Sequence, residues 1–357
     1  MNVQINEGES KNLSQRETKR RRSLVPAVII FFCALAVILA AFYVFLRIYN
    51  CYSFVYILNE DGDTCTISEI KQRGIAPFIY FPEELAVPET MGGKYKVTAI
   101  GDGAVKCSAK PAKVTLPEGI TSIGEGAFEG CFNLESVTAP GLTSLGEGAF
   151  RGCISLTSAE LGERLWAIGD FAFEGCASLA SFNVPASVES VGEGAFRGCT
   201  SLEGISFKNE LSLIGAYAFW GCTSLEKIEA KGVFALGEYA FWGCTSLSEA
   251  NLGAVKSVGE GAFARCTAFE LLALADGTEI IGDKAFSGCT SLSRLSLPAG
   301  LRGIGDCAFE KCTSLKTVNY AGTPKDWEDI TLGELWAEGS VLSSVKADGG
   351  EISLNSK

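Results

Sequence analysis

Apolar positions return along most of the chain with a period of 22 or 23 residues. Each period contains an Ala-Phe pair, and nine such Phe residues follow one another at this spacing. They are Phe128, Phe150, Phe173, Phe196, Phe219, Phe241, Phe263, Phe286 and Phe309. A fixed period of this length is typical of a solenoid, in which each repeat forms one coil stacked on the previous one.

Other positions of the period keep their chemistry too. An aliphatic residue followed by Gly stands five residues before each Phe, and a Cys stands three residues after it. A Leu, or Phe269 once, follows three residues after the Cys, and the stretch beyond alternates apolar and polar residues like a half-buried strand. We therefore predict one short strand, a turn and a helical or 3-10 segment in each coil, with the strands paired in parallel about 4.8 Å apart.

A different apolar pattern occupies the start of the chain. The 23 residues from Leu24 to Leu46 carry no charge, which is enough to span a bilayer as a helix. The largely basic stretch RETKRRR at residues 16–22 precedes this segment, and only Arg47 lies close on its far side. The alternative is a cleaved signal peptide, whose apolar core would be shorter. We expect an uncleaved signal-anchor over 24–48 after a disordered cytoplasmic tail over 1–23, with the rest of the chain extracellular in a single-pass topology at the cell membrane.

Composition excludes several kinds of chemistry. The 357 residues include 14 Cys but no His, so no Ser-His-Asp or Cys-His site can form. The net charge is -12, and residues 1–50 hold seven of the 30 basic and three of the 42 acidic residues. The remainder of the chain therefore has 23 basic and 39 acidic residues, a surface that repels nucleic acid. We expect no enzymatic activity, no cofactor and no nucleic-acid partner.

Two columns of the repeat have alternative interpretations. The nine Cys residues of the column from Cys131 to Cys312 would be buried free thiols, because stacked parallel side chains have poor torsions for disulfides. In the caps, Cys51 with Cys65 or Cys307 with Cys312 remains an alternative pair. An acidic residue stands three positions before every Phe except at Ala216. An acidic residue here would accept the N–H groups at the start of a short helix. The alternative is a Ca²⁺ site, but no second acidic column completes an oxygen cage, so we predict no metal site.

Aromatic residues gather in two adjacent coils. Tyr217 and Trp220 lie in one coil and Tyr239 and Trp242 occupy the same positions in the next. Clustered Tyr and Trp residues mark interaction surfaces and can stack on sugar rings, so these four are the candidate ligand-binding residues. The alternative is that they only cover neighbouring coils. The outward strand positions are small, polar and mildly acidic, which indicates a solvated face or a broad, weak contact with a basic partner.

The repeated pattern, aliphatic-Gly-acid-x-Ala-Phe-x-Gly-Cys-x-x-Leu, resembles the BspA-type leucine-rich repeat, a family of surface proteins of bacteria and some protozoa. The resemblance covers Val97 to Tyr320 and implies a leucine-rich-repeat solenoid of about ten repeats over 97–320. It also implies a β-rich N-terminal cap over 49–96 and a C-terminal cap over 321–357.

The family implies binding or adhesion at the cell surface and supplies no catalytic residues. The sequence therefore predicts a membrane-anchored extracellular protein that captures a protein or glycan. The alternative is a structural spacer of the cell envelope without a dedicated ligand.

Overall fold

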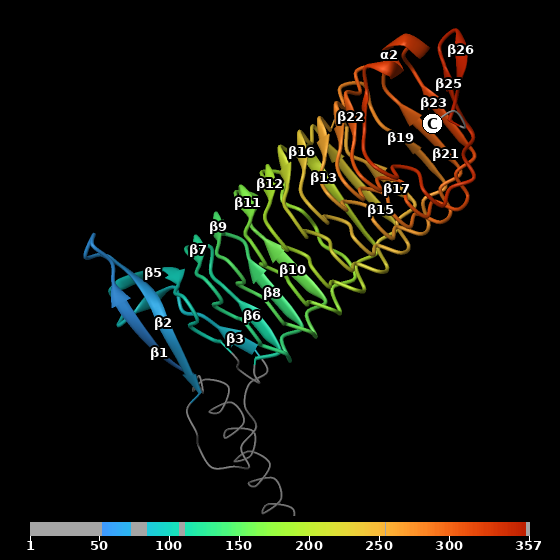
Figure 1. Ribbon diagram of the computed structural model, residues 1–357. Helices are drawn as coiled ribbons and strands as arrows, with labels where there is room; N and C mark the ends of the chain where they lie inside the picture. Colours follow the sequence, from blue (N-terminus) through green and yellow to red (C-terminus); the bar gives the residue numbers. More distant parts are fainter. Residues whose placement is uncertain (1–51, 73–83, 107–110, 254, 355–357) are drawn as a thin grey trace, which may run out of the picture. The chain divides into compact units, whose positions relative to one another are not determined.

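The computed structural model describes residues 52–72, 84–106, 111–253 and 255–354 (Figure 1). The chain divides into two units, Met1–Ser53 with Gln72–Pro82 and Phe54–Lys71 with Glu83–Lys357, and the second unit carries the repeats. The predicted span from Leu24 to Leu46 lies outside the described residues. Among those that are described, no helix is both long and apolar enough to cross a bilayer.

Most coils contribute two strands rather than the single strand predicted. The first is two residues long in most coils and ends at the aliphatic residue before Gly, and the second is the longer strand that the alternating pattern predicted. A two-residue strand is too short to produce a detectable alternation of apolar and polar positions, so the sequence pattern did not reveal it.

The short strands form two sheets, parallel from β2 onward except for the antiparallel pair of β4 and β5. The first sheet contains β1 (Tyr52–Leu58), β2 (Thr64–Gln72), β5 (Tyr95–Ile100), β7 (Ser122–Ile123) and β9 (Ser144–Leu145), with β4 (Thr90–Met91) paired to β5. The second contains β11 (Ala167–Ile168), β12 (Ser190–Val191), β14 (Leu213–Ile214), β16 (Ala235–Leu236), β18 (Ser257–Val258), β20 (Ile280–Ile281), β22 (Gly303–Ile304) and β24 (Thr331–Leu332).

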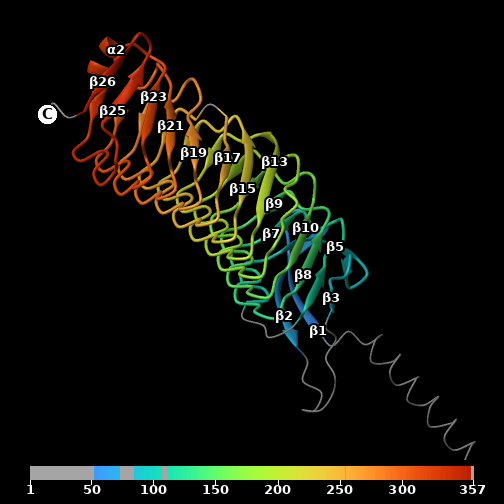
Figure 2. The same cartoon turned by 90° about the vertical axis from the view of Figure 1, so that its right-hand side faces the viewer.

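The longer strands form three separate sheets, which follow one another along the array in Figure 2. The first contains β3 (Glu84–Ala86), β6 (Lys113–Thr115), β8 (Ser136–Ala139) and β10 (Ser158–Leu161). The second contains β13 (Gly204–Glu210), β15 (Lys227–Lys231) and β17 (Glu249–Asn251). The third contains β19 (Leu271–Ala273), β21 (Arg294–Leu297), β23 (Thr317–Tyr320), β25 (Ser344–Ala347) and the antiparallel β26 (Gly350–Ser353).

The segment around the Ala-Phe pair is a run of turns, so the predicted helical or 3-10 segment is wrong. In the coil of Phe128, alternate N–H groups donate to the next coil: Gly126 to Glu147, Phe128 to Ala149 and Gly130 to Arg151, over 2.7–2.8 Å. A helix would need these donors for its own carbonyls. Gly126 and Gly130 have φ angles of 53° and 69°, a left-handed conformation that interrupts a right-handed helix.

The Phe column is the centre of the core. The rings from Phe128 to Phe309 are buried, and neighbouring rings stack with centroids 5.1–5.5 Å apart and planes 1–13° apart. Trp336 closes the column with an edge contact to Phe309. Because no coil can bury this face alone, the stack itself provides the burial that stabilises each coil.

The C-terminal segment closes the array. Helix α2 (Pro324–Glu328) begins at a capping box formed by Thr323 and Asp326, and its Trp327 packs against Tyr320. The N–H groups of the last coil find acceptors in the residues beyond. The backbone N–H of Cys307 donates to the carbonyl of Glu334, that of Phe309 to Trp336, and that of Lys311 to Glu338.

Candidate binding surface

The four aromatic residues singled out by the sequence lie together in the structure. Tyr217 and Tyr239 stack with centroids 5.5 Å apart, and Trp220 and Trp242 stack with centroids 4.9 Å apart. Both Tyr residues have positive φ, at a position that four of the nine Ala-Phe coils give to Gly. All four side chains are half-buried. The parallel register of the coils therefore aligns equivalent side chains, as the sequence predicted.

The outer faces of the Trp pair are covered by arginines. The guanidinium of Arg197 lies 4.9 Å from the ring centroid of Trp220, and that of Arg265 lies 5.1 Å from that of Trp242. Each indole thus has one face on its partner and one on a cation. A sugar ring would have to displace one of these contacts to stack here, which favours a packing role. Ligand binding by the four aromatic residues stays a prediction.

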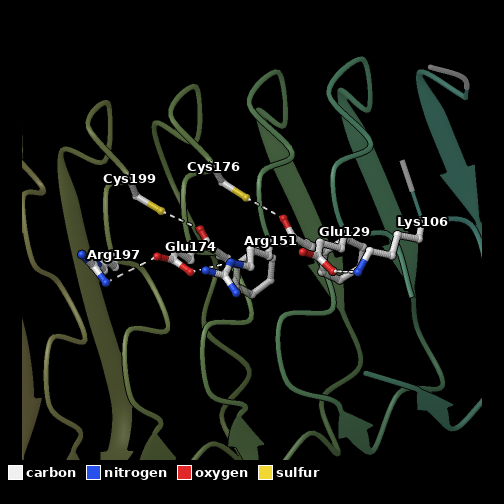
Figure 3. A network of polar contacts seen from close by, with 9 residues as sticks. Lys106, Glu129, Arg151, Glu174, Cys176, Arg197 and Cys199 are labelled. Carbon is white, nitrogen blue, oxygen red and sulfur yellow. Dashed lines mark hydrogen bonds and ion pairs between the residues drawn. The ribbon is translucent and has the colours of Figure 1, made fainter. Parts of the chain in front are cut away.

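The Trp pair continues a column of charged side chains, which Figure 3 shows. Glu174 lies between Arg151 and Arg197, with N–O distances of 2.7 and 3.6 Å, and Lys106 lies 2.5 Å from Glu129. Opposite charges at the same position of adjacent coils attract one another as cross-strand pairs do. The column therefore joins coils by ion pairs in its first half and by the aromatic stack of Trp220 and Trp242 in its middle.

The Cys column is buried and reduced among the described residues. Each Sγ from Cys131 to Cys312 lies 3.1–3.2 Å from a carbonyl oxygen of the preceding coil, which belongs to Phe in every case but the first. Figure 3 shows two of these bonds, from Cys176 and Cys199. Burial raises the pKa of Cys222 to about 12, so these thiols are poor nucleophiles and metal ligands. Cys307 is half-buried and also free.

The aspartates of the acidic column act between coils and not within a helix. The carboxylate of Asp170 accepts the N–H of Glu193 at 2.7 Å, and that of Asp283 accepts the N–H of Asp306 at 2.8 Å. The Gly before the acidic residue is required because two coils approach closely here: a Cβ on Gly192 would lie 2.3 Å from Asp170 Oδ1 and 2.7 Å from the backbone N of Asp170. In the described part of the chain, no three His, Cys, Asp or Glu side chains are placed to share a metal ion.

The sequence did not reveal a hollow on the face of the longer strands. It has a volume of about 790 Å³ and lies where the sheet of β10 ends and that of β13 begins. A second hollow of about 360 Å³ shares Ser206, Lys208 and Glu229 with the first and reaches Asn251. We call the two together the groove. Each hollow by itself is of the size that small ligands occupy.

A break in strand pairing forms one end of the groove. Phe182 occupies the inward position that smaller residues such as Ala159 and Ile205 fill in adjacent coils, and its ring packs on Phe173 and Phe196. The coil of Phe182 lacks the second, longer strand. Its pairing with the next coil is reduced to a single bridge between Ser181 and Gly204. The sheet therefore stops here and leaves space on its outer face.

A register shift places a lysine at the middle of the groove. Ser206 pairs with Glu229 and Glu210 pairs with Lys231, so three residues of β13, Phe207–Asn209, face Ala230 alone. Such bulges change the direction of a side chain locally. Lys208 lies in this bulge, is exposed, and lines both hollows.

Some charged side chains of the groove form ion pairs and others do not. Lys227 lies 2.9 Å from Glu229 and 3.0 Å from Glu249, and these contacts raise the pKa of Lys227 and lower that of Glu229. Lys208 and Lys231 form no ion pair with any residue that the structure describes. The groove thus holds two cations outside any ion pair on a strongly acidic domain, of which Lys231 also helps to lower the pKa of Glu229.

A sequence signal for these lysines exists in retrospect. They occupy the position that follows the longer strand, which holds Pro in five coils and Gly or Ala in others. The Pro residues are Pro88, Pro117, Pro140, Pro185 and Pro298, with Lys208 and Lys231 in the two coils after Pro185. An exposed cation in a column of turn residues is the departure that marks the groove.

Comparison with known proteins places the chain in a family. A family model described as a BspA type leucine rich repeat region of six copies matches residues 98–226, 166–270 and 256–331, well over half of the chain. The protein belongs to the BspA-type leucine-rich-repeat family. No enzymatic family is indicated, and none of the curated proteins matches the chain.

Several solved bacterial repeat proteins are similar. A leucine rich repeat protein of T. pallidum is 28% identical, with 54% of this chain and 87% of that chain covered and a TM-score of 0.49. A leucine rich cell surface protein of Faecalibacterium prausnitzii is 24% identical, with 78% and 96% covered and a TM-score of 0.37. The pneumococcal vaccine antigen PcpA is 17% identical, with 82% and 97% covered and a TM-score of 0.43. All three TM-scores lie below 0.5, so the assignment rests on the repeats.

Proposed function

We propose that this protein is a membrane-anchored extracellular binding protein that captures a protein or glycan at the cell surface. The groove is the observation that supports this function best. It is a ligand-sized hollow in which charged and polar side chains stand around a buried apolar floor, on a face made of paired strands. Membership in a family of repeat proteins without catalytic residues agrees with binding and not with turnover.

Anchoring is the second part of the proposal. The apolar segment from Leu24 to Leu46 would be the span, with the basic residues before it on the cytoplasmic side. Treatment of intact cells with a protease tests this topology: the repeats should be digested from outside, while a tag at the N-terminus stays protected until the membrane is opened. Protection of the repeats in intact cells would contradict it.

Binding is tested with the full chain in detergent micelles. We would measure its binding to arrays of glycans, envelope polymers and extracellular proteins, alongside a Ser206→Trp variant that fills the groove. Loss of a ligand in this variant would place the site in the groove. A Trp220→Ala/Trp242→Ala variant tests the aromatic residues in the same way, and we expect it to bind normally because the ring faces are already covered. If no variant and no array shows binding, the protein is a spacer of the envelope.

A further inference from the structure

The groove is an exception to the charge of the domain around it. After residue 50 the chain carries a large excess of acidic residues, so most of its surface repels anions. In the groove the acidic side chains are engaged: Glu229 pairs with Lys227, and Glu163 accepts the N–H of Ala186 at 2.9 Å. Lys208 and Lys231 remain for an anionic ligand.

The bulge that carries Lys208 is held in place. The side-chain amide of Asn209 donates to the carbonyl of Ala186 in the preceding coil, and Ala186 in turn binds Glu163 one coil further. This chain of hydrogen bonds joins three coils at the rim. Lys208 therefore projects from a fixed backbone, which reduces the entropy lost when a ligand binds it.

The lining favours a glycan over a peptide. The apolar residues beneath the groove are buried, with Phe182 6% exposed and Ile205 4% exposed, so no pocket receives an apolar side chain. Exposed hydroxyl, amide and amino groups lie along the lining, among them those of Ser181, Asn183 and Asn251. Such groups match the hydroxyls of a sugar, whereas a peptide would need an apolar anchor.

We infer that the groove binds a carboxylated glycan, whose carboxylate is held by Lys208 with Lys231 beside it. The inference rests on the proposed function and names the ligand class for it. From the coil of Ser181 to that of Asn251 the groove crosses three coil spacings, about 15 Å at the strand spacing of a sheet. This length accommodates a short linear oligosaccharide along the array. The ammonium–carboxylate contact is charge-assisted and weakens as salt rises.

The test uses the full chain and pairs of oligosaccharides. Each pair consists of a uronate- or sialate-bearing oligosaccharide and its methyl ester, which differ only in the negative charge. We expect binding of the acid and at least a tenfold weaker binding of the ester. Lys208→Ala should weaken binding of the acid at least tenfold, and Lys208→Arg should retain most of it. Lys316→Ala is the control, because Lys316 is exposed just before the longer strand β23, outside the groove lining.

The outcomes separate this inference from the proposed function. Three results would overturn the carboxylated-glycan inference. They are equal affinity of the Lys208→Ala and Lys316→Ala variants for the acid, equal affinity of the unaltered chain for acid and ester, and tighter binding of a poly-glutamate peptide than of the acid. If the arrays show a neutral glycan or a protein bound independently of Lys208, the binding function holds and the carboxylated-glycan assignment fails. Absence of every ligand overturns both. A circular dichroism spectrum identical to that of the unaltered chain confirms that Lys208→Ala is folded.

Discussion

The indole planes of Trp220 and Trp242 lie 5° apart, with ring centroids separated by 4.9 Å. Arg197 and Arg265 cover the two outer faces, so four side chains from four coils form one stack. Stacked aromatic pairs contribute about 0.5–1.5 kcal/mol beyond their burial, and exposed cation–π contacts about 0.5–1 kcal/mol. The stack therefore stabilises the middle of the array, where ion pairs no longer join the column.

A double-mutant cycle measures this stack. Trp220→Ala and Trp242→Ala should each lower the free energy of unfolding by about 1–2 kcal/mol, with a coupling of about 0.5–1.5 kcal/mol because each removes the other's partner. Urea unfolding followed by circular dichroism provides the measurement. Trp166→Ala is the control, since Trp166 is 63% exposed and should change stability by less than about 0.5 kcal/mol. Strictly additive losses would show that the rings do not stabilise one another.

A methyl group added where the backbones of two coils approach closely should lower the stability of the chain. A Cβ on Gly215 would lie 2.7 Å from the backbone N of Glu193 and from the backbone carbon of Gly192. We expect Gly215→Ala to destabilise the chain by about 1–3 kcal/mol, because backbone atoms must move apart. Gly300→Ala is the matched control, with no atom within 4 Å of its Cβ. Equal midpoints of thermal unfolding for the two variants would contradict the packing described.

The aspartates of the acidic column should contribute more to the free energy of unfolding than the glutamates. Asp170→Ala removes the acceptor of the Glu193 N–H and should lower the free energy of unfolding by about 1 kcal/mol. Glu147→Ala serves for comparison, because the Glu147 side chain has no such bond in the structure, and it should be nearly neutral. The measurement is chemical unfolding of both variants side by side, and a larger loss for Glu147→Ala would refute the assignment.

The buried thiols predict a loss of stability in alkaline solution. Burial raises the pKa of Cys222 and of Cys312 to about 12, whereas an unfolded thiol titrates near 9. Between these values the unfolded chain releases a proton that the folded chain keeps, so stability is full below pH 9 and falls as pH rises. The expected loss is about 1.4 kcal/mol per pH unit per thiol.

Urea unfolding at pH 7.5 and pH 10, with a reductant present, checks this dependence. Cys222→Ala lacks one titrating thiol, so the difference in its unfolding free energy between the two pH values should be about 1 kcal/mol smaller than that of the unaltered chain. Identical differences for the two proteins would mean that Cys222 is not buried as described.

The columns of the core could be predicted from sequence because every coil repeats the same packing problem. Nine Phe residues at one spacing determine the stacking of Phe128 on Phe150 and of each later ring on the next. The hydrogen bonds of the turns could not be predicted in the same way. Whether the N–H of Phe128 bonds within its own coil or to Ala149 depends on the placement of the next coil, which periodicity does not specify.

The candidate surface could be predicted only in part, for a similar reason. Equivalent positions made the alignment of Trp220 with Trp242 foreseeable, but the arginines that cover them come from two further coils. The groove arises where the repeat is irregular, at Phe182 and in the bulge around Lys208. A prediction that averages over the repeats removes these departures from the repeat pattern. These departures distinguish one coil from another.

The closing residues Glu334, Trp336 and Glu338 accept the same three N–H groups that any interior coil would offer to its successor. The end of the array therefore does not depend on how many coils precede it. Whole coils can be duplicated or deleted away from the groove without leaving an unsatisfied donor. The length of the array is thus a property that unequal recombination can increase or decrease in steps of one coil, while the groove stays unchanged.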